Sequence, residues 1–334
     1  LKVVRDSGLP SSRHAFFMPN ATGPCRFGSY AQAQHLAMKR MGMGDVPIMS
    51  PSSENSYLGM PSDARKQVWQ GILCGDYLLK AQMRTRPYER NPGQVNAEAE
   101  KWIKRLESDF ENTRDPKPTL ESAVKAILSL PTVPGRKPLA GIVGEIYVRC
   151  DPFANAHVID AIEEAGGEAW LSPFAEWILY TVWIERAHVR DRPEGLIERI
   201  INEFGNLYID RQDREYHELM EPLLGDRMEP SMDSITEAGL EYIDHEFEGE
   251  SVLTVGRAIR FFEEGADLVV NASPFGCMHG HISGSVFETI IAKYGRPVVT
   301  SFYDGTTKNT NIRSFILAAQ KRAARNDRLR SAIA

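Results

Sequence analysis

The chain has few of the residues that cross-link a protein or bind it to nucleic acid. Its 334 residues include four cysteines, Cys25, Cys74, Cys150 and Cys277, and no two of them form a CxxC pair. At this size and density a disulfide scaffold is not expected, so the predicted compartment is the reducing cytoplasm. The net charge is −6 and no strongly basic run is present, which argues against nucleic acid as a partner.

Long apolar runs and nucleotide motifs are also missing. No stretch approaches the roughly 18 uninterrupted apolar residues of a membrane helix, so no membrane partner is expected. There is no GxxxxGK[ST] loop, so we expect no ATP hydrolysis by P-loop chemistry and no nucleotide bound by this part. The GxSxG elbow and the HExxH motif of two hydrolase classes are also absent. The first residue is Leu1 and no signal-peptide pattern follows it, which suggests a piece or a processed product of a longer protein.

Alternating strand and helix patterns predict an α/β protein with short parallel sheets. Residues 131–138 contain three prolines and one glycine, which is typical of a linker. We therefore predict a first α/β domain with a helical extension over residues 1–133 and a second, flavodoxin-like domain over residues 139–334. In the second, residues 139–148 predict a strand, 152–165 a helix and 174–244 a helical region.

One loop carries the most informative motif. The apolar run at residues 266–271 predicts a buried strand, and residues 282–293 predict a helix. The segment between them, SPFGCMHGH at residues 273–281, presents Cys277 at the carboxyl end of the strand, where open α/β sheets bind ligands. A helix N-terminus favours a thiolate, which can attack a substrate or ligate a metal.

A second cysteine has a similar context. Cys25 also follows a short strand pattern and a Gly-Pro pair, and it precedes a predicted helix. The two loop cysteines are either coincidental or face one cleft as a soft ligand pair suited to iron–sulfur or zinc. Two thiolates are too few for a closed tetrahedral site, so a third ligand would come from elsewhere. Cys74 and Cys150 have helical contexts and are predicted to be structural.

Further polar residues lie near the predicted carboxyl edge of the second sheet. Glu145 and Arg149 come near the end of the predicted strand, where they would face a ligand or pair with each other to stabilise the loop. His279 and His281 flank a glycine and would cap the helix through backbone contacts, with one of them as a proton relay. The candidate catalytic residues are Glu145 and His279.

Taken together in order, these segments resemble a known protein group. The chain is similar to the cluster-carrying part of large activator-related proteins of the 2-hydroxyacyl-CoA dehydratase, benzoyl-CoA reductase and double-cubane-cluster group. The resemblance covers most of the chain. Its specific points are FFMP at 16–19, GPCRFG at 23–28, SPSS at 50–53, RPYE at 86–89, VGEIYVR at 143–149, FAN at 153–155, PFGCM at 274–278 and YDG at 303–305.

The resemblance implies two flavodoxin-like, or Rossmann-like, domains with short parallel sheets and extra helices. In that family three cysteines per subunit hold a low-potential iron–sulfur cluster, of [4Fe-4S] or double-cubane type, between the domains. Cys25 and Cys277 match two of the three. The third is expected in a Glu-Cys-Tyr-Pro-like segment upstream of Leu1.

The resemblance also implies a function. The family passes one low-potential electron to a thioester or another substrate that is hard to reduce, and ATP hydrolysis on an activase partner drives the transfer. The expected setting is oxygen-sensitive, anaerobic metabolism, with a small-molecule substrate such as a CoA thioester and with homodimer formation left open. The alternatives are a cluster-less interaction or scaffold domain of a larger fusion protein, and a zinc-dependent hydrolase, which needs more ligands than the sequence offers.

Overall fold

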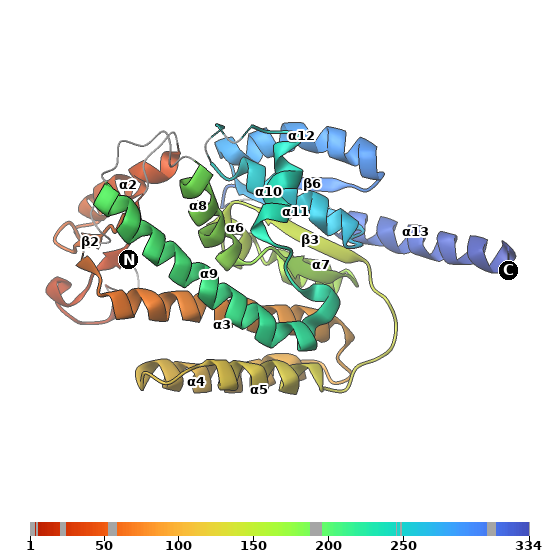
Figure 1. Cartoon of the computed structure of the whole chain (residues 1–334), viewed down its shortest axis with the longest axis horizontal. Coiled ribbons are helices and arrows are strands. Elements are labelled where there is room, and N and C mark those ends of the chain that lie inside the picture. The colour runs from red at the N-terminus through yellow and green to blue at the C-terminus, as the bar shows by residue number, and fades with distance from the viewer. Residues whose placement is uncertain are drawn as a thin grey trace. The chain divides into compact units, whose positions relative to one another are not determined.

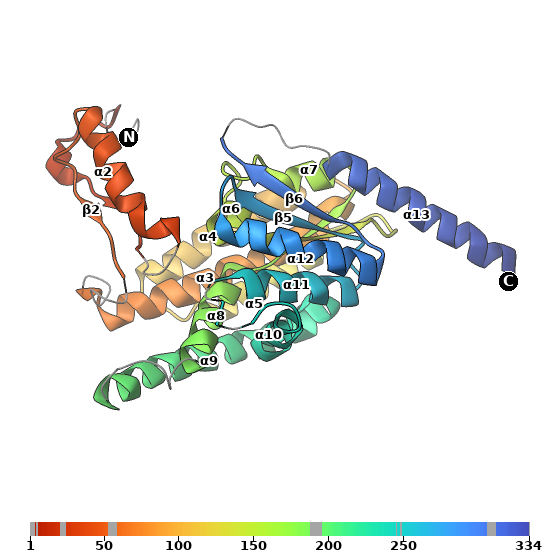
Figure 2. The same ribbon diagram turned by 90° about the horizontal axis from the view of Figure 1, so that it is seen from above.

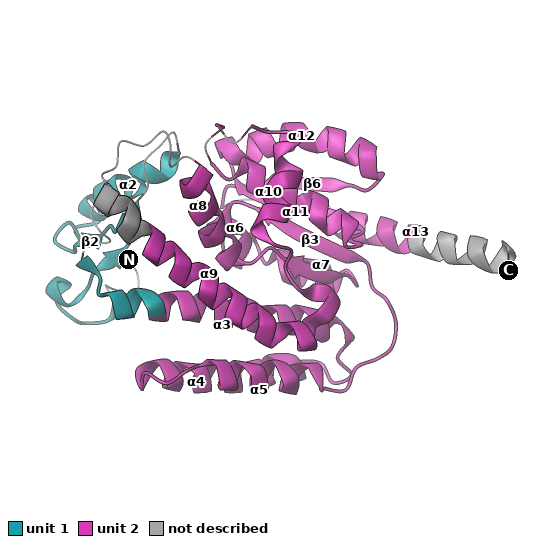
Figure 3. Cartoon of the chain, viewed as in Figure 1, with its two compact units in different colours: residues 1–66 teal, residues 67–334 magenta. Residues whose placement is uncertain are grey.

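The structure is a computed structural model that describes residues 4, 6–20, 25–52, 59–187, 196–244, 246–247, 249–305 and 312–333. The side chains of residues 196–202 and 323–333 are not described. Contacts divide the chain into two compact units, residues 1–66 and residues 67–334 (Figure 3). Each unit is described by itself below.

The first unit contains a two-stranded parallel sheet. Its elements are η1 (Ser11–Arg13), β1 (Phe16–Phe17), η2 (Arg26–Ser29), α2 (Tyr30–Arg40) and β2 (Ile48–Met49). Phe16 pairs with Ile48 and Phe17 with Met49. Parallel strands need a crossover connection, and α2 lies within the segment that supplies it.

The second unit combines helices with a larger parallel sheet. Its first helix, α3, starts just before the unit boundary. The elements in chain order are α3 (Ser62–Thr85), η4 (Arg86–Tyr88), α4 (Gln94–Glu111), α5 (Lys117–Leu128), β3 (Leu139–Gly144), α6 (Ile146–Cys150), α7 (Val158–Glu164), β4 (Glu168–Leu171), α8 (Phe174–Ala187), α9 (Leu196–Leu224), η5 (Gly225–Arg227), α10 (Met232–Leu240), α11 (Ser251–Glu263), β5 (Leu268–Pro274), α12 (Met278–Tyr294), β6 (Val298–Tyr303) and α13 (Ile312–Ile333).

The four strands of this sheet are all parallel, in the order β4-β3-β5-β6. In order along the chain this is 2-1-3-4, the order of the first four strands of flavodoxin-like folds. β3 is buried along its whole length, as expected for a parallel strand covered on both faces. The predicted α/β class with short parallel sheets is confirmed.

Helices cover both faces of the sheet (Figures 1 and 2). On one face Val143 and Val269 pack against apolar residues of α10, α11 and α12. On the other face Ile142 and Val270 pack against α7 and α13. This alternation along β3 and β5 follows from the two-residue period of a strand.

Two predicted boundaries differ from the structure. The strand predicted over residues 139–148 ends at Gly144, and residues 146–150 form α6 instead. The helix predicted over residues 152–165 is confined to α7, because Ala156 and His157 have left-handed φ angles of 50° and 58° that interrupt a helix.

The helices α3, α4, α5 and α9 share one apolar core, which also includes Ala175 of α8. The proline-rich segment lies along this unit, since the Val133 amide donates to the Tyr88 carbonyl at 2.8 Å and the Arg90 amide to the Pro131 carbonyl at 2.9 Å. The contacts therefore divide the chain near Lys66, whereas the domains predicted from the sequence meet at residues 131–138. Those domains stay a prediction.

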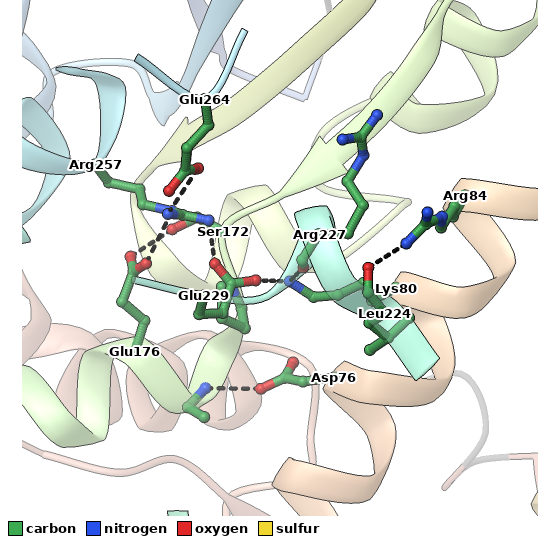
Figure 4. Close-up of polar contacts among 12 residues, drawn as sticks. Asp76, Lys80, Arg84, Ser172, Glu176, Leu224, Arg227, Glu229, Arg257 and Glu264 are labelled. Atoms are coloured by element: carbon green, nitrogen blue, oxygen red, sulfur yellow. Dashed lines mark hydrogen bonds and ion pairs between the residues drawn. The ribbon is translucent and has the colours of Figure 1, made fainter. Parts of the chain in front are cut away.

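Buried charges connect α3 with the helices that cover the sheet (Figure 4). Lys80 of α3 forms an ion pair with Glu229 and donates to the Arg227 carbonyl at 2.9 Å. Arg257 of α11 also binds Glu229, and its Nε lies 3.2 Å from the Glu176 carboxylate on α8. The side chains of Lys80, Arg257 and Glu176 are at most 4% exposed. We call these residues, with Glu264, the charge network.

The indole of Trp170 on β4 lies among the cations of this network. The Lys80 ammonium, the Arg227 guanidinium and the Arg257 guanidinium lie 5.6, 5.1 and 5.4 Å from its ring. Asp76 of α3 adds a further link, because its carboxylate accepts the Phe174 and Ala175 amides at the start of α8 at 3.1 and 2.8 Å. Burial raises the pKa of Asp76 to about 6.

We expect Arg257→Met to lower the free energy of unfolding by about 3–5 kcal/mol, because the buried Glu176 would lose its nearest cation and Glu229 would keep only Lys80. Urea denaturation at neutral pH, followed by circular dichroism, measures the loss. The control is Lys125→Met, whose partner Glu121 lies on the same exposed helix face, and it should cost at most about 0.5 kcal/mol. Equal losses for the two variants would contradict a stabilising charge network.

Candidate functional site

Several helices of the second unit begin at the carboxyl edge of its sheet. In a parallel sheet, the helix after each strand starts at that edge, and the helix before a strand runs back from it. Glu145 precedes α6, Pro173 precedes α8, Glu250 precedes α11 and Cys277 precedes α12. Ligands of open α/β sheets bind at this edge, which makes it the candidate site.

Cys277 stands at the N-cap of α12, on the loop that the sequence predicts. The Phe275 amide binds the Tyr303 carbonyl at 2.9 Å, and the Cys277 amide binds the Pro274 carbonyl at 3.1 Å. Gly276 takes a φ of 75°, which suits glycine in this turn. The Cys277 side chain is half-buried at the edge.

A glycine allows α12 to lie close to β5. A Cβ atom on Gly280 would come within 2.7 Å of the Ser273 side chain and 3.2 Å of the Phe302 ring. Any larger residue at this position would push the first turn of α12 away from the strand. The glycine therefore fixes where Cys277, three residues earlier, is presented.

Cys25 has an equivalent position in the first unit. It is the N-cap of η2, is exposed, and its sulfur accepts the Phe27 amide at 3.4 Å. Residues 21–24, which hold the preceding Gly-Pro pair, lie outside the described residues. Because Cys25 belongs to one unit and Cys277 to the other, a cleft shared by the two stays a prediction.

The other two cysteines are packed as structural residues. Cys74 is buried in the core of α3, and its thiol donates to the Tyr216 hydroxyl at 3.8 Å. Cys150 ends α6 and packs against the core that includes α7 and α13. Burial raises the pKa of Cys74 to about 12 and that of Cys150 to about 11, so both thiols stay protonated at neutral pH.

The predicted catalytic residue Glu145 lies at the carboxyl edge, half-buried, but at a helix start rather than within a strand. Its carboxylate accepts the Val148 amide at 2.8 Å. Gly144 just before it has a φ of 120°, and a Cβ atom there would lie 2.0 Å from the Ala272 carbonyl oxygen. The strand therefore has to end in glycine, which turns the chain so that Glu145 begins α6.

Arg149 does not face a ligand position. Its side chain is 1% exposed and donates to the Gly144 and Pro173 carbonyls at 3.2 and 2.9 Å. It also lies 3.8 Å from the Glu176 carboxylate. Arg149 therefore holds the loops through these carbonyls and Glu176, and the ion pair with Glu145 considered from the sequence is not among the contacts of the described residues.

The second predicted catalytic residue, His279, is enclosed in the first turn of α12. It is 7% exposed, and its ring nitrogens lie 2.9 Å from the Thr254 hydroxyl and 3.4 Å from the Ser251 hydroxyl. Burial, with the nearby Arg149 charge, lowers the pKa of His279 to about 3, so the imidazole is neutral at physiological pH. The neighbouring His281 is exposed and stacks on Phe302 at 4.7 Å.

The sequence analysis missed one acidic residue at this edge, Glu250. Burial, and then the charge of Glu145, raises the pKa of Glu250 to about 7, while Arg149 and a hydrogen bond from Trp177 act in the opposite direction. The sequence shows that Glu250 directly precedes an amphipathic helix. Acidic residues are common at helix starts, so this position alone does not mark a functional residue. Only the fold brings it near Glu145.

The RPYE segment at residues 86–89 lies away from this edge and has structural partners. Arg86 makes two hydrogen bonds to the Glu163 carboxylate at 2.7 and 2.9 Å. The Tyr88 hydroxyl donates to Glu168, the first residue of β4, at 2.7 Å. Glu89 accepts two amides at the start of α4. The arginine, tyrosine and glutamate of this segment therefore join α4, α7 and β4.

No protein-family model, curated protein or solved structure matches the chain. Within the described ranges, no three His, Cys, Asp or Glu side chains are grouped so as to hold a metal ion. None of the helices in the described part of the chain combines the length and apolar character needed to cross a membrane. The function therefore has to be argued from the carboxyl edge itself.

The cysteine environments predict an order of reactivity. We expect iodoacetamide at pH 8 to label Cys25 much faster than Cys74, because Cys25 is exposed whereas Cys74 is buried with a raised thiol pKa. Mass spectrometry of peptides after a short labelling pulse measures each rate. Protein unfolded in urea serves as the control, in which both cysteines should react at similar rates. Equal labelling in the folded protein would contradict these environments.

Proposed function

We propose that this chain is the iron–sulfur-cluster-carrying component of an ATP-driven, low-potential electron-transfer system that acts as an acyl-CoA dehydratase or reductase. The observation that carries the proposal is the position of Cys277, a half-buried thiol at the start of a 17-residue helix on the carboxyl edge of a parallel sheet. The segments shared with the dehydratase and reductase group support the same function.

The donor chemistry of the two candidate ligands fits such a cluster. Cysteine thiolates are the usual ligands of iron–sulfur clusters, and Cys25 and Cys277 each directly precede a helix. The Cys25 sulfur accepts the Phe27 amide at 3.4 Å. Cys25 and Cys277 would be two of the ligands, and a third would come from elsewhere. When bound, the cluster would supply one-electron chemistry.

The residues of this chain would hold and shield that group. Cys25 and Cys277 would ligate it, and hydrogen bonds from backbone amides to the sulfurs would raise its potential relative to bare thiolates. The exposed apolar side chains next to Cys277 in the chain, those of Phe275 and Met278, would limit the access of water once a partner or substrate covers them.

The proposal includes a partner, a substrate and a compartment. The sequence has no P-loop, so ATP would be hydrolysed by a separate activase module or protein. The substrate would be a small molecule such as a CoA thioester. The expected compartment is the cytoplasm, where thiols stay reduced.

Replacing one proposed ligand tests the cluster. In the full-length protein, reconstituted anaerobically with iron and sulfide, Cys277→Ser should lower the iron content several-fold and abolish activity, because a serine hydroxyl is a harder and less acidic ligand. Iron analysis and the visible absorption of the cluster measure the effect. Cys150→Ser is the matched control, and it should retain both the iron and the activity.

The same experiment separates the alternative function. If Cys150→Ser loses the iron and Cys277→Ser keeps it, the site lies at the other loop. If neither variant changes the iron content, and the wild-type protein binds none, the cluster proposal is wrong. The chain would then be a cluster-less interaction or scaffold domain.

A further inference from the structure

The His279 side chain is enclosed by residues from two other elements of the carboxyl edge. One ring nitrogen lies 2.9 Å from the Thr254 hydroxyl and the other lies 3.4 Å from the Ser251 hydroxyl, both on α11. The ring also forms a hydrogen bond with the backbone of Gly144, the last residue of β3. Because His279 is only 7% exposed, it offers a ligand little surface. The imidazole therefore joins the start of α12 to the start of α11 and to the end of β3.

The hydroxyl groups that face the ring are themselves buried. Ser251 is 2% exposed and Thr254 is 1% exposed. A hydroxyl group can both donate and accept a hydrogen bond, and a neutral imidazole has one donor and one acceptor, so the two types of group suit each other. If an apolar side chain replaced the ring, both hydroxyls would lose this partner inside the protein, which is costly for a buried polar group.

The helix that holds the ring, α11, is itself firmly packed. Residues 251–259 are all buried. Gly256 has no room for a Cβ atom beside the Ile235 carbonyl, so the backbones of α10 and α11 are in contact. Arg257, on the same helix, belongs to the charge network. A side chain that binds to α11 is therefore attached to a rigid part of the second unit.

The start of α12 benefits from such a support because a turn precedes it. Gly276 in this turn has a φ of 75°, and the side chain of Cys277, the N-cap residue, makes no capping hydrogen bond to its own helix. His279 follows two residues later in the first turn. The orientation of Cys277 therefore depends on the bonds of the His279 ring as well as on the close backbone approach at Gly280.

We propose that His279 is a positioning residue that fixes the first turn of α12 against α11 and thereby holds the Cys277 thiol at the carboxyl edge. A side chain that orients a ligand-binding residue in this way supports a site without touching what it binds. The role of Cys277 as a cluster ligand rests on the proposed function. The role of His279 in holding the loop does not depend on which group Cys277 binds.

Alkylation of Cys277 measures how firmly this turn is held. His279→Leu removes the bonds of the ring, and Thr254→Val removes one partner hydroxyl at almost constant volume. In both variants iodoacetamide at pH 8 should label Cys277 about 5–10-fold faster than in the wild type, because losing one or two buried hydrogen bonds favours local opening by roughly this factor. Thr254→Ser keeps the hydroxyl and should label within about twofold of the wild type. Peptide mass spectrometry after a short pulse gives the rates.

Two controls separate positioning from a general loss of stability. His281→Leu makes the same substitution two residues further along α12 at an exposed side chain, and it should leave the labelling of Cys277 unchanged. Cys74, in the core that includes α3, reports opening of that core and should stay slow in every variant. The proposal is overturned if Cys277 keeps its wild-type rate in both His279→Leu and Thr254→Val, or if Cys74 accelerates in parallel with Cys277.

Iron content separates this inference from the proposed function. In the full-length protein reconstituted anaerobically, His279→Leu and Thr254→Val should bind several-fold less iron than the wild type, whereas Thr254→Ser and His281→Leu should bind as much. Unchanged iron content in the first two variants of a protein that binds iron would overturn the part of His279 in the site. If the wild type binds no iron, the proposed function fails, and the labelling rates still decide whether His279 holds the loop.

Discussion

The second unit depends on charges that are buried where α3 meets the sheet. Lys80, Arg257 and Glu176 come from three helices, and each is almost fully removed from water, so no one of them is stable there without the others. Trp170 fills the space between the cations and ties them to β4. This arrangement makes the helices α3, α4, α5 and α9 part of the same compact unit as the sheet, and it fixes the start of α8 at the carboxyl edge.

The carboxyl edge is shaped by two close backbone approaches. Gly144 lies against the Ala272 carbonyl, and Gly280 lies against Ser273, so β3 and α12 are both held tightly to β5. These contacts bring the starts of α6 and α12 to the carboxyl edge of the sheet. The backbone contacts therefore determine the positions of Glu145, Cys277 and the enclosed His279. Glu250 lies at the start of α11, which begins at the same edge.

The sequence allows some of these features to be predicted and conceals others. The apolar run before Cys277 and the glycine-rich loop after it predict the strand, the loop and the helix, because all three signals are local. The end of β3 was missed, since the apolar pattern continues past Gly144 into α6. The charge network could not be predicted, because Lys80, Glu229 and Arg257 are far apart in the chain and each is of a type that usually lies at the surface. Glu250 was missed for the same reason.

The cap of α8 has a consequence for how this protein can be divided. Asp76 supplies the hydrogen bonds at the start of α8 from 98 and 99 residues earlier in the chain. A fragment that begins at residue 139 would keep every strand of the four-stranded sheet, yet it would leave the first amides of α8 without their acceptor and Glu229 without Lys80. The proline-rich segment therefore has the composition of a domain linker, but the residues that follow it still depend on contacts with α3.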